Sequence, residues 1–139
     1  MKSIFLIDDD PIFVHLTKKI INSTNCQYAI SEFTDGELAI HHLEEIREQA
    51  DLLPDVIFLD LNMPVMDGWE FLNEYDTLSS KIKKEIALFI VSSSISPQDV
   101  ERSKSYRTVT DFLIKPVGKG KILEIIDHVR GMDERRRGA

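Results

Sequence analysis

Two uninterrupted apolar runs constrain the fold of this chain more than any other feature. They are Ile4–Ile7 and Val56–Leu59, and each is followed directly by an aspartate, Asp8 and Asp60 respectively. A strand made only of apolar residues is typical of a parallel sheet that is covered by helices on both faces. The sequence therefore predicts a buried parallel sheet with acidic residues at the carboxyl ends of its strands.

Longer amphipathic segments alternate with the apolar runs. Weaker strand patterns occupy residues 27–33, 87–91 and 112–114, and helical patterns separate them. The first helix is expected to use Asp10 as its N-cap and Pro11 as its first residue, because proline there loses no needed hydrogen-bond donor. Five strand–helix repeats favour an α/β fold with a doubly wound parallel sheet, since right-handed crossovers place helices on both faces.

Three of the predicted helices carry an apolar stripe at helical spacing. The stripes are Ile12, Leu16 and Ile20 in the first helix, Ala39, Leu43, Ile46 and Ala50 in the second, and Ile122, Ile125, Ile126 and Val129 in the last. Each stripe is expected to face the sheet. Residues 1–131 are expected to form one domain, and residues 132–139 a short polar C-terminal tail.

The composition of the chain limits the classes of binding partner and the cellular location that we expect. A net charge of -7 argues against nucleic acid or an anionic membrane as a partner, because such partners select an excess of lysine and arginine. No apolar run approaches the roughly 20 residues that cross a bilayer, and the N-terminus lacks a signal-peptide pattern. We expect a cytoplasmic protein, monomeric or weakly dimeric, whose single Cys26 forms no intramolecular disulfide.

Polar residues of a few chemical types follow the predicted strands. They are Asp8 and Asp9 after the first strand, Asp60 after the third, Ser92 after the fourth and Lys115 after the fifth. In open α/β sheets the ligand crevice lies beyond the carboxyl ends of the strands. These side chains, which are far apart in the sequence, are therefore expected to meet there.

The residue types fit one chemistry. Three adjacent carboxylates repel one another and raise each other's pKa unless a cation lies among them, and a hard ion such as Mg²⁺ suits oxygen ligands. Asp60 could then attack phosphorus as a nucleophile and form an aspartyl phosphate. The Lys115 ammonium and the Ser92 hydroxyl could hold the phosphoryl oxygens.

These stretches resemble the receiver domains of response regulators, the CheY-like family. The matching segments are residues 7–11, 59–68, 92–93 and 112–116. The resemblance implies a flavodoxin-like (βα)5 fold with strand order 2-1-3-4-5. It also implies a single-domain response regulator of a two-component or phosphorelay system, a signalling switch and not an enzyme acting on other substrates. Its partners would be a histidine kinase or a histidine phosphotransfer protein, and a downstream protein target.

The resemblance also implies a role for individual residues. Asp60 matches the phosphoacceptor. Asp9 matches a direct carboxylate ligand of Mg²⁺, and Asp8 a ligand acting through water. The remaining matches are Asn62, whose backbone carbonyl would bind the metal, Ser92, Ser93 and Lys115 at the phosphoryl group, Phe112 as the switch aromatic, and Pro116, whose bond to Lys115 would be cis.

The sequence departs from the common family pattern in two places. Residues 36–54 are longer than usual, which predicts an extended helix or loop before the third strand. Residues 108–111, Thr-Val-Thr-Asp, replace a small Gly-Ala pair before the last strand. The second departure does not touch the acidic cluster of Asp8, Asp9 and Asp60.

Other functions share parts of this pattern. A haloacid-dehalogenase-like phosphatase would use Asp8 as its nucleophile and Asp10 as acid and base, but it gives no role to Asp60 or to residues 62–68. A flavin carrier has the same topology, but no phosphate-binding loop rich in Ser, Thr and Gly follows the first strand. A receiver that serves only for docking would not need the complete acidic set. Ser94 flanks the expected site and is interpreted as a loop residue.

Overall fold

The structure is a computed structural model that describes residues 2–93 and 96–138, without the side chains of residues 130 and 132–138. Five parallel strands form one sheet in the order β2-β1-β3-β4-β5, which confirms the expected topology. The strands are β1 (Lys2–Ile7), β2 (Tyr28–Phe33), β3 (Val56–Asp60), β4 (Ala87–Ser92) and β5 (Asp111–Ile114).

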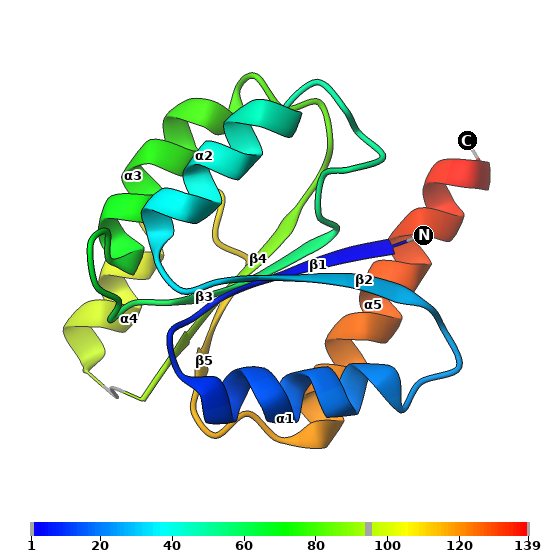
Figure 1. Cartoon of the computed structure of the whole chain (residues 1–139), viewed down its shortest axis with the longest axis horizontal. Helices are drawn as coiled ribbons and strands as arrows, with labels where there is room; N and C mark the ends of the chain where they lie inside the picture. Colours follow the sequence, from blue (N-terminus) through cyan, green and yellow to red (C-terminus); the bar gives the residue numbers. More distant parts are fainter. Residues whose placement is uncertain (1, 94–95, 139) are drawn as a thin grey trace.

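Helices connect the strands and cover both faces of the sheet. They are α1 (Pro11–Asn22), α2 (Gly36–Ile46), α3 (Gly68–Ser79), α4 (Pro97–Ser103) and α5 (Lys119–Gly138). Figure 1 shows α2 and α3 on one side of the sheet and α1 and α5 on the other. The backbone of residues 132–138 continues α5, so the expected short tail is the end of this helix. Within the described residues, no helix combines the length and the apolar character needed to cross a bilayer.

The sheet divides the apolar core into two clusters. Ile57 and Leu59 of β3 pack in the cluster beneath α2 and α3, whereas Val56 and Phe58 of the same strand pack against α1 and α5. Successive side chains of a strand point to opposite faces, so a strand buried on both sides must be apolar throughout. This explains the uninterrupted run that ends at Asp60.

Helix α1 uses only one residue of the stripe that its spacing suggested, because Ile20 packs partly buried against the core. Ile12 and Leu16 are exposed, at 70% and 53% of their accessible surface, whereas Phe13, Val14 and Ile21 are buried. The first turn of the helix is apolar on two adjacent sides, and periodicity alone does not choose between them. The direction in which α1 crosses the sheet makes that choice.

The long connection between α2 and β3 is a loop, because α2 ends at Ile46 and exposed Ala50 lies beyond it. Lys84 Nζ donates to the carbonyls of Ala50 and Leu53 at 3.1 and 2.8 Å. It also lies 3.3 Å from Asp55 Oδ1. The extra residues are thus tied down at the amino end of β3, away from the carboxyl ends of the strands.

Candidate functional site

The structure brings three carboxylates together at the carboxyl edge of the sheet. One oxygen from each of Asp8, Asp9 and Asp60 lies within 4.8 Å of the others. Asp8 and Asp60 are buried, at 3% and 6% exposure, whereas Asp9 is exposed. Because β1 and β3 are neighbouring parallel strands, their ends deliver these residues to the same place.

The turn between β1 and α1 is ordered by backbone hydrogen bonds. Asp8 N donates to Phe33 O at 2.9 Å, and Asp10 N donates to Asp8 Oδ1 at 2.9 Å. Asp10 Oδ1 in turn accepts the N–H of Ile12 at 3.0 Å and caps α1, as predicted. The Asp8 carboxylate is therefore held by the turn that starts the helix.

Lys115 enters the cluster from the end of β5. Its backbone N donates to Ser92 O at 2.8 Å, and its bond to Pro116 is cis. Its ammonium Nζ lies 3.0 Å from Asp8 Oδ2 and 4.0 Å from Asp60 Oδ2, and the side chain is 13% exposed. The cation is thus largely buried among carboxylates.

The electrostatics of Asp60 reflect this crowding. Burial, and then the negative charge of Asp8, raise the pKa of Asp60 to about 7, against the opposing effects of Lys115 and the Asn62 N–H. Burial also raises the pKa of Asp8, although the Asp10 N–H and Lys115 oppose it. Burial lowers the pKa of Lys115, but the carboxylates around it, Asp8 first, hold that pKa above its ordinary value. Negative charge exceeds positive charge in the cluster.

This charge excess fits a divalent cation. The donors are carboxylate oxygens, which hard ions such as Mg²⁺ prefer. Asp8 Oδ2 is buried and makes no well-formed hydrogen bond, although the Lys115 ammonium is near. A cation beside exposed Asp9 would satisfy this oxygen and relieve the repulsion that raises the pKa of Asp60.

The loop from β3 to α3 packs tightly against the acidic edge. Gly68 N donates to Leu61 O at 2.9 Å, and Asn62 N lies 3.4 Å from Asp60 Oδ1. Met66 N donates to Pro64 O at 2.7 Å across Val65, whose φ of 65° is a conformation that β-branched residues avoid. Such local strain is tolerated where the surrounding contacts determine the backbone.

Ser92 and Phe112 share one face of the sheet. Ser92 is completely buried and pairs with Ile114 across β4 and β5, while Ile90 pairs with Phe112. Residues two apart on a strand point the same way, so both side chains face the α2 and α3 side, where Phe112 packs against the core. Ser93 is exposed and lines a groove that also contains Lys115. Ser94 lies outside the described residues.

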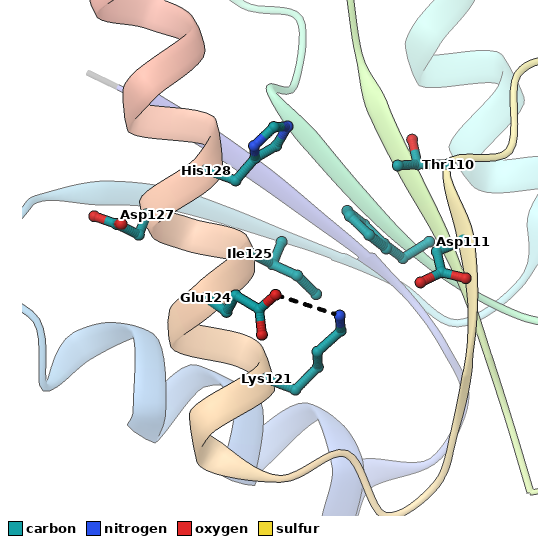
Figure 2. Close-up of a pocket in the computed structure, with 8 residues that line it drawn as sticks. Thr110, Asp111, Lys121, Glu124, Ile125, Asp127 and His128 are labelled. Atoms are coloured by element: carbon teal, nitrogen blue, oxygen red, sulfur yellow. Dashed lines mark ion pairs between the residues drawn. The ribbon is translucent and has the colours of Figure 1, made fainter.

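A second hollow lies elsewhere, between β5 and α5. Its volume is about 400 Å³. Figure 2 shows an ion pair between Lys121 and Glu124 in its wall, and Lys121 Nζ lies 3.8 Å from Glu124 Oε1. Its wall includes Asp111, which begins β5, whereas Lys115 follows the end of that strand. The hollow therefore contains none of the residues expected to carry phosphoryl chemistry.

Two contacts of Lys115 were not anticipated from the sequence. Its Nζ lies 3.4 Å from Asp10 Oδ2 and 5.0 Å from the centroid of the Phe13 ring. The interpretation of Asp10 as a helix cap was right but incomplete. The only available signal was the third aspartate of the run 8–10, which directly follows the two proposed metal ligands.

Comparison with known proteins decides the family. The family model described as the response regulator receiver domain matches residues 4–127 of the chain. The chain belongs to the response regulator receiver domain family. This family serves two-component signalling, and its members bind Mg²⁺ through acidic residues. The resemblance inferred from the motifs is thus confirmed.

Curated relatives place the receiver domain in proteins of different lengths. The chain is 27% identical to a chemotaxis protein CheY of Listeria monocytogenes over 88% of its own length and 93% of the relative. It is 30% identical to a protein-glutamate methylesterase/protein-glutamine glutaminase of Treponema denticola, but spans only 28% of that protein. It is 31% identical to the rice two-component response regulator ORR26 and spans 20% of it.

Solved receiver structures share the fold. A two-component response regulator from Cytophaga hutchinsonii superposes with a TM-score of 0.81 at 29% identity, over 94% of this chain and 98% of that one. The phosphorylated cyanobacterial phytochrome response regulator RcpA gives a TM-score of 0.73 at 28% identity, over 96% and 91%. Rcp1, solved with Mn²⁺ bound, gives 0.73 at 25%, over 96% and 92%.

Proposed function

We propose that this receiver domain acts as a response regulator that is switched by Mg²⁺-dependent phosphorylation of Asp60. The observation that carries the proposal is the position of Asp60: its buried carboxylate ends β3, within 4.8 Å of two further carboxylates, and faces the largely buried Lys115. The phosphoryl donor would be a phosphohistidine of a histidine kinase or of a histidine phosphotransfer protein.

The transfer itself needs few groups. An oxygen of ionised Asp60 attacks phosphorus and forms an O–P bond, while the P–N bond of the phosphohistidine breaks. The electron pair of that bond stays on the imidazole nitrogen, which is left free to take a proton from water. Lys115 and Ser92 would hold the phosphoryl oxygens, whose charge is the main thing such a site must stabilise.

The magnesium site would be built from the same acidic edge. Asp9 and Asp60 would bind the ion directly, Asp8 would bind it through water, and Asn62 would offer its backbone carbonyl. When bound, the ion supplies positive charge for the phosphoryl oxygens. It also favours the ionised form of Asp60, whose pKa of about 7 in the metal-free site would otherwise leave much of this nucleophile protonated near neutral pH.

Treatment with acetyl phosphate and Mg²⁺ tests the proposal. The wild type should gain the mass of one phosphoryl group, and the gain should be lost when Mg²⁺ is chelated. Asp60→Asn should show no gain, because the amide is not a nucleophile toward phosphorus. Intact-mass measurement gives the result.

Asp55→Asn is the matched control, because Asp55 is also a buried carboxylate, 6% exposed, but lies at the amino end of the same strand. It should be phosphorylated like the wild type. Equal labelling of Asp60→Asn and the wild type would place the nucleophile elsewhere, with Asp8 the first residue to examine.

Transmission from Asp60 to a partner would use the shared face of β4 and β5. A phosphoryl group that draws the Ser92 hydroxyl toward it would open space on that face, and the partly buried Phe112 ring could turn inward to fill it. The surface formed by α4, β5 and α5 would repack, and a downstream protein that prefers one packing would respond. Coupling of about 1–3 kcal/mol suffices for such a switch.

Ser92→Ala should separate phosphorylation from transmission. The variant should still be phosphorylated, because Asp60 and Lys115 are intact, but NMR shifts around Phe112 on adding beryllofluoride should shrink by more than half. Shifts that stay full-sized in the variant would exclude Ser92 as the link. If, in the wild type, beryllofluoride shifts the NMR signals of the acidic residues but not those around Phe112, the downstream protein must bind another surface.

The phosphatase alternative fits the geometry less well. Asp10, which would have to act as acid and base there, is committed to capping α1 and to contacting Lys115. We therefore favour a switch without further enzymatic activity. Its partners would be proteins and not nucleic acid or a membrane. The protein would act in the cytoplasm, as a monomer or weak dimer. The acidic net charge of -7 supports the choice of partner.

A further inference from the structure

Asp10 has two oxygens with different contacts. Oδ1 accepts the backbone N–H of Ile12 at 3.0 Å and of Phe13 at 3.4 Å, which fixes the carboxylate at the start of α1. Oδ2 points the other way and lies 3.4 Å from Lys115 Nζ. One side chain therefore both starts a helix and holds the lysine of the site.

The Lys115 ammonium lies nearer to Asp8 and Asp10, in the turn between β1 and α1, than to Asp60. Nζ is 3.0 Å from Asp8 Oδ2 and 3.4 Å from Asp10 Oδ2, but 4.0 Å from Asp60 Oδ2. It is also 5.0 Å from the centroid of the Phe13 ring, within the range of a cation–π contact. The unphosphorylated protein thus shares its lysine between the phosphoacceptor and the first turn of α1.

Asp10 cannot follow the lysine. Its Oδ1 is held by two backbone donors, and moving the carboxylate would break the cap that stabilises the start of α1. Once Asp60 is phosphorylated, the phosphoryl oxygens are stronger anionic partners for the Lys115 ammonium than the Asp60 carboxylate was. Asp10 then competes for Lys115 from a fixed position.

We propose that Asp10 is a positioning residue that restrains Lys115 in the unphosphorylated protein and so opposes phosphorylation of Asp60. The inference rests on the function proposed above. Two effects of the Asp10 charge act in the same direction, because it holds the lysine back and also repels the incoming phosphoryl anion. Only the first effect acts through Lys115, and experiment can separate the two.

Asp10→Asn and Asp10→Ser test the restraint. Both keep a side-chain oxygen that can cap α1, but both remove the carboxylate beside Lys115. Each should be phosphorylated by acetyl phosphate about three- to fivefold faster than the wild type, and should bind beryllofluoride more tightly by the same factor, the size expected for one partly exposed ion pair. The measurements belong at saturating Mg²⁺, since a lost carboxylate also weakens the attraction for the ion.

Asp35→Asn is the matched control, because Asp35 caps α2 through Leu38 N at 2.9 Å in the same way. It should change neither rate nor affinity. In a Lys115→Gln background, Asp10→Asn should lose most of its effect on beryllofluoride affinity. An undiminished effect there would show that Asp10 acts by charge alone and would overturn the positioning role.

The failure of this inference differs from the failure of the proposed function. If the wild type is phosphorylated on Asp60 while Asp10→Asn and Asp10→Ser match it in rate and affinity, Asp10 is only a helix cap. A wild type that takes up no phosphoryl group would instead overturn the proposed function, and the inference with it.

Discussion

At about pH 8 without Mg²⁺, Asp60→Asn is expected to be more stable than the wild type by about 2–4 kcal/mol in the free energy of unfolding. Burial, and then the charge of Asp8, raise the pKa of Asp60 from 3.8 to about 7. Each unit of difference between folded and unfolded states corresponds to about 1.4 kcal/mol, which sets the upper limit. Asparagine carries no charge and removes this penalty.

The sign of the pH dependence follows from proton binding. Between the unfolded pKa near 3.8 and the folded pKa of about 7, the unfolded state has released the Asp60 proton and the native state retains it. The native state therefore binds more protons, and this contribution to stability falls as the pH rises. The advantage of Asp60→Asn should be near zero below the lower value, grow through this window and be complete above the upper value.

Urea denaturation across this pH range measures the effect, and Mg²⁺ supplies a second check. The ion should stabilise the wild type by binding its native, ionised form, and so narrow the gap to Asp60→Asn. Asp55→Asn is the control, because the Asp55 carboxylate has favourable partners. It accepts a hydrogen bond from Ser3 N at 2.9 Å and forms an ion pair with Lys84 at 3.3 Å. That variant should lose stability. If Asp60→Asn were no more stable than the wild type at about pH 8, the destabilisation assigned to the raised pKa of Asp60 would be wrong.

Gly68→Ala is expected to lower the free energy of unfolding by about 3 kcal/mol. A Cβ at Gly68 would lie 2.5 Å from Asp60 O and 2.7 Å from Leu61 Cα. Both are backbone atoms, so no side-chain rotation relieves the contact. The loop that carries the phosphoacceptor would have to shift, and the rate of phosphorylation by acetyl phosphate should fall as well.

Gly120→Ala separates this clash from the general effect of replacing glycine. Gly120 lies in α5, and its Cβ would meet no atom within 4 Å. Alanine there should be neutral or stabilising by up to about 1 kcal/mol, since it favours the helix. Thermal and urea unfolding of both variants provide the comparison. Equal stability of Gly68→Ala and Gly120→Ala would mean that the loop accommodates the methyl group freely.

The fold was largely predictable because its information is local. The runs at residues 4–7 and 56–59 are apolar at every position, and only a strand covered on both faces requires that. Alternation with helices then dictates parallel strands and right-handed crossovers. The strand order itself came from the family resemblance, whose motifs lie mostly at strand ends and in the loops that follow them.

The same logic located the acidic edge. Asp8 and Asp60 each stand directly after such a run, and neighbouring parallel strands bring their ends together. The meeting of Asp8, Asp9 and Asp60 could therefore be predicted without coordinates. Their roles in binding metal and phosphoryl groups remain proposals.

Other features depended on contacts between distant segments. The predicted apolar stripe of α1 was right for Ile20 but wrong for Ile12, because the crossing of α1 over the sheet buries Phe13 in its place. The contact of Lys115 with Asp10 joins residues 105 positions apart, which no spacing rule connects.

Sequence alone thus determined the strands, the helices and the edge where the acidic residues gather, because periodicity and strand ends are properties of short segments. Only the tertiary structure decided which face of α1 is buried, how the lysine is shared and why residue 68 must be glycine. Each of these depends on the distance between two backbones, as between Gly68 and Asp60 O, and such distances are set by how whole elements pack.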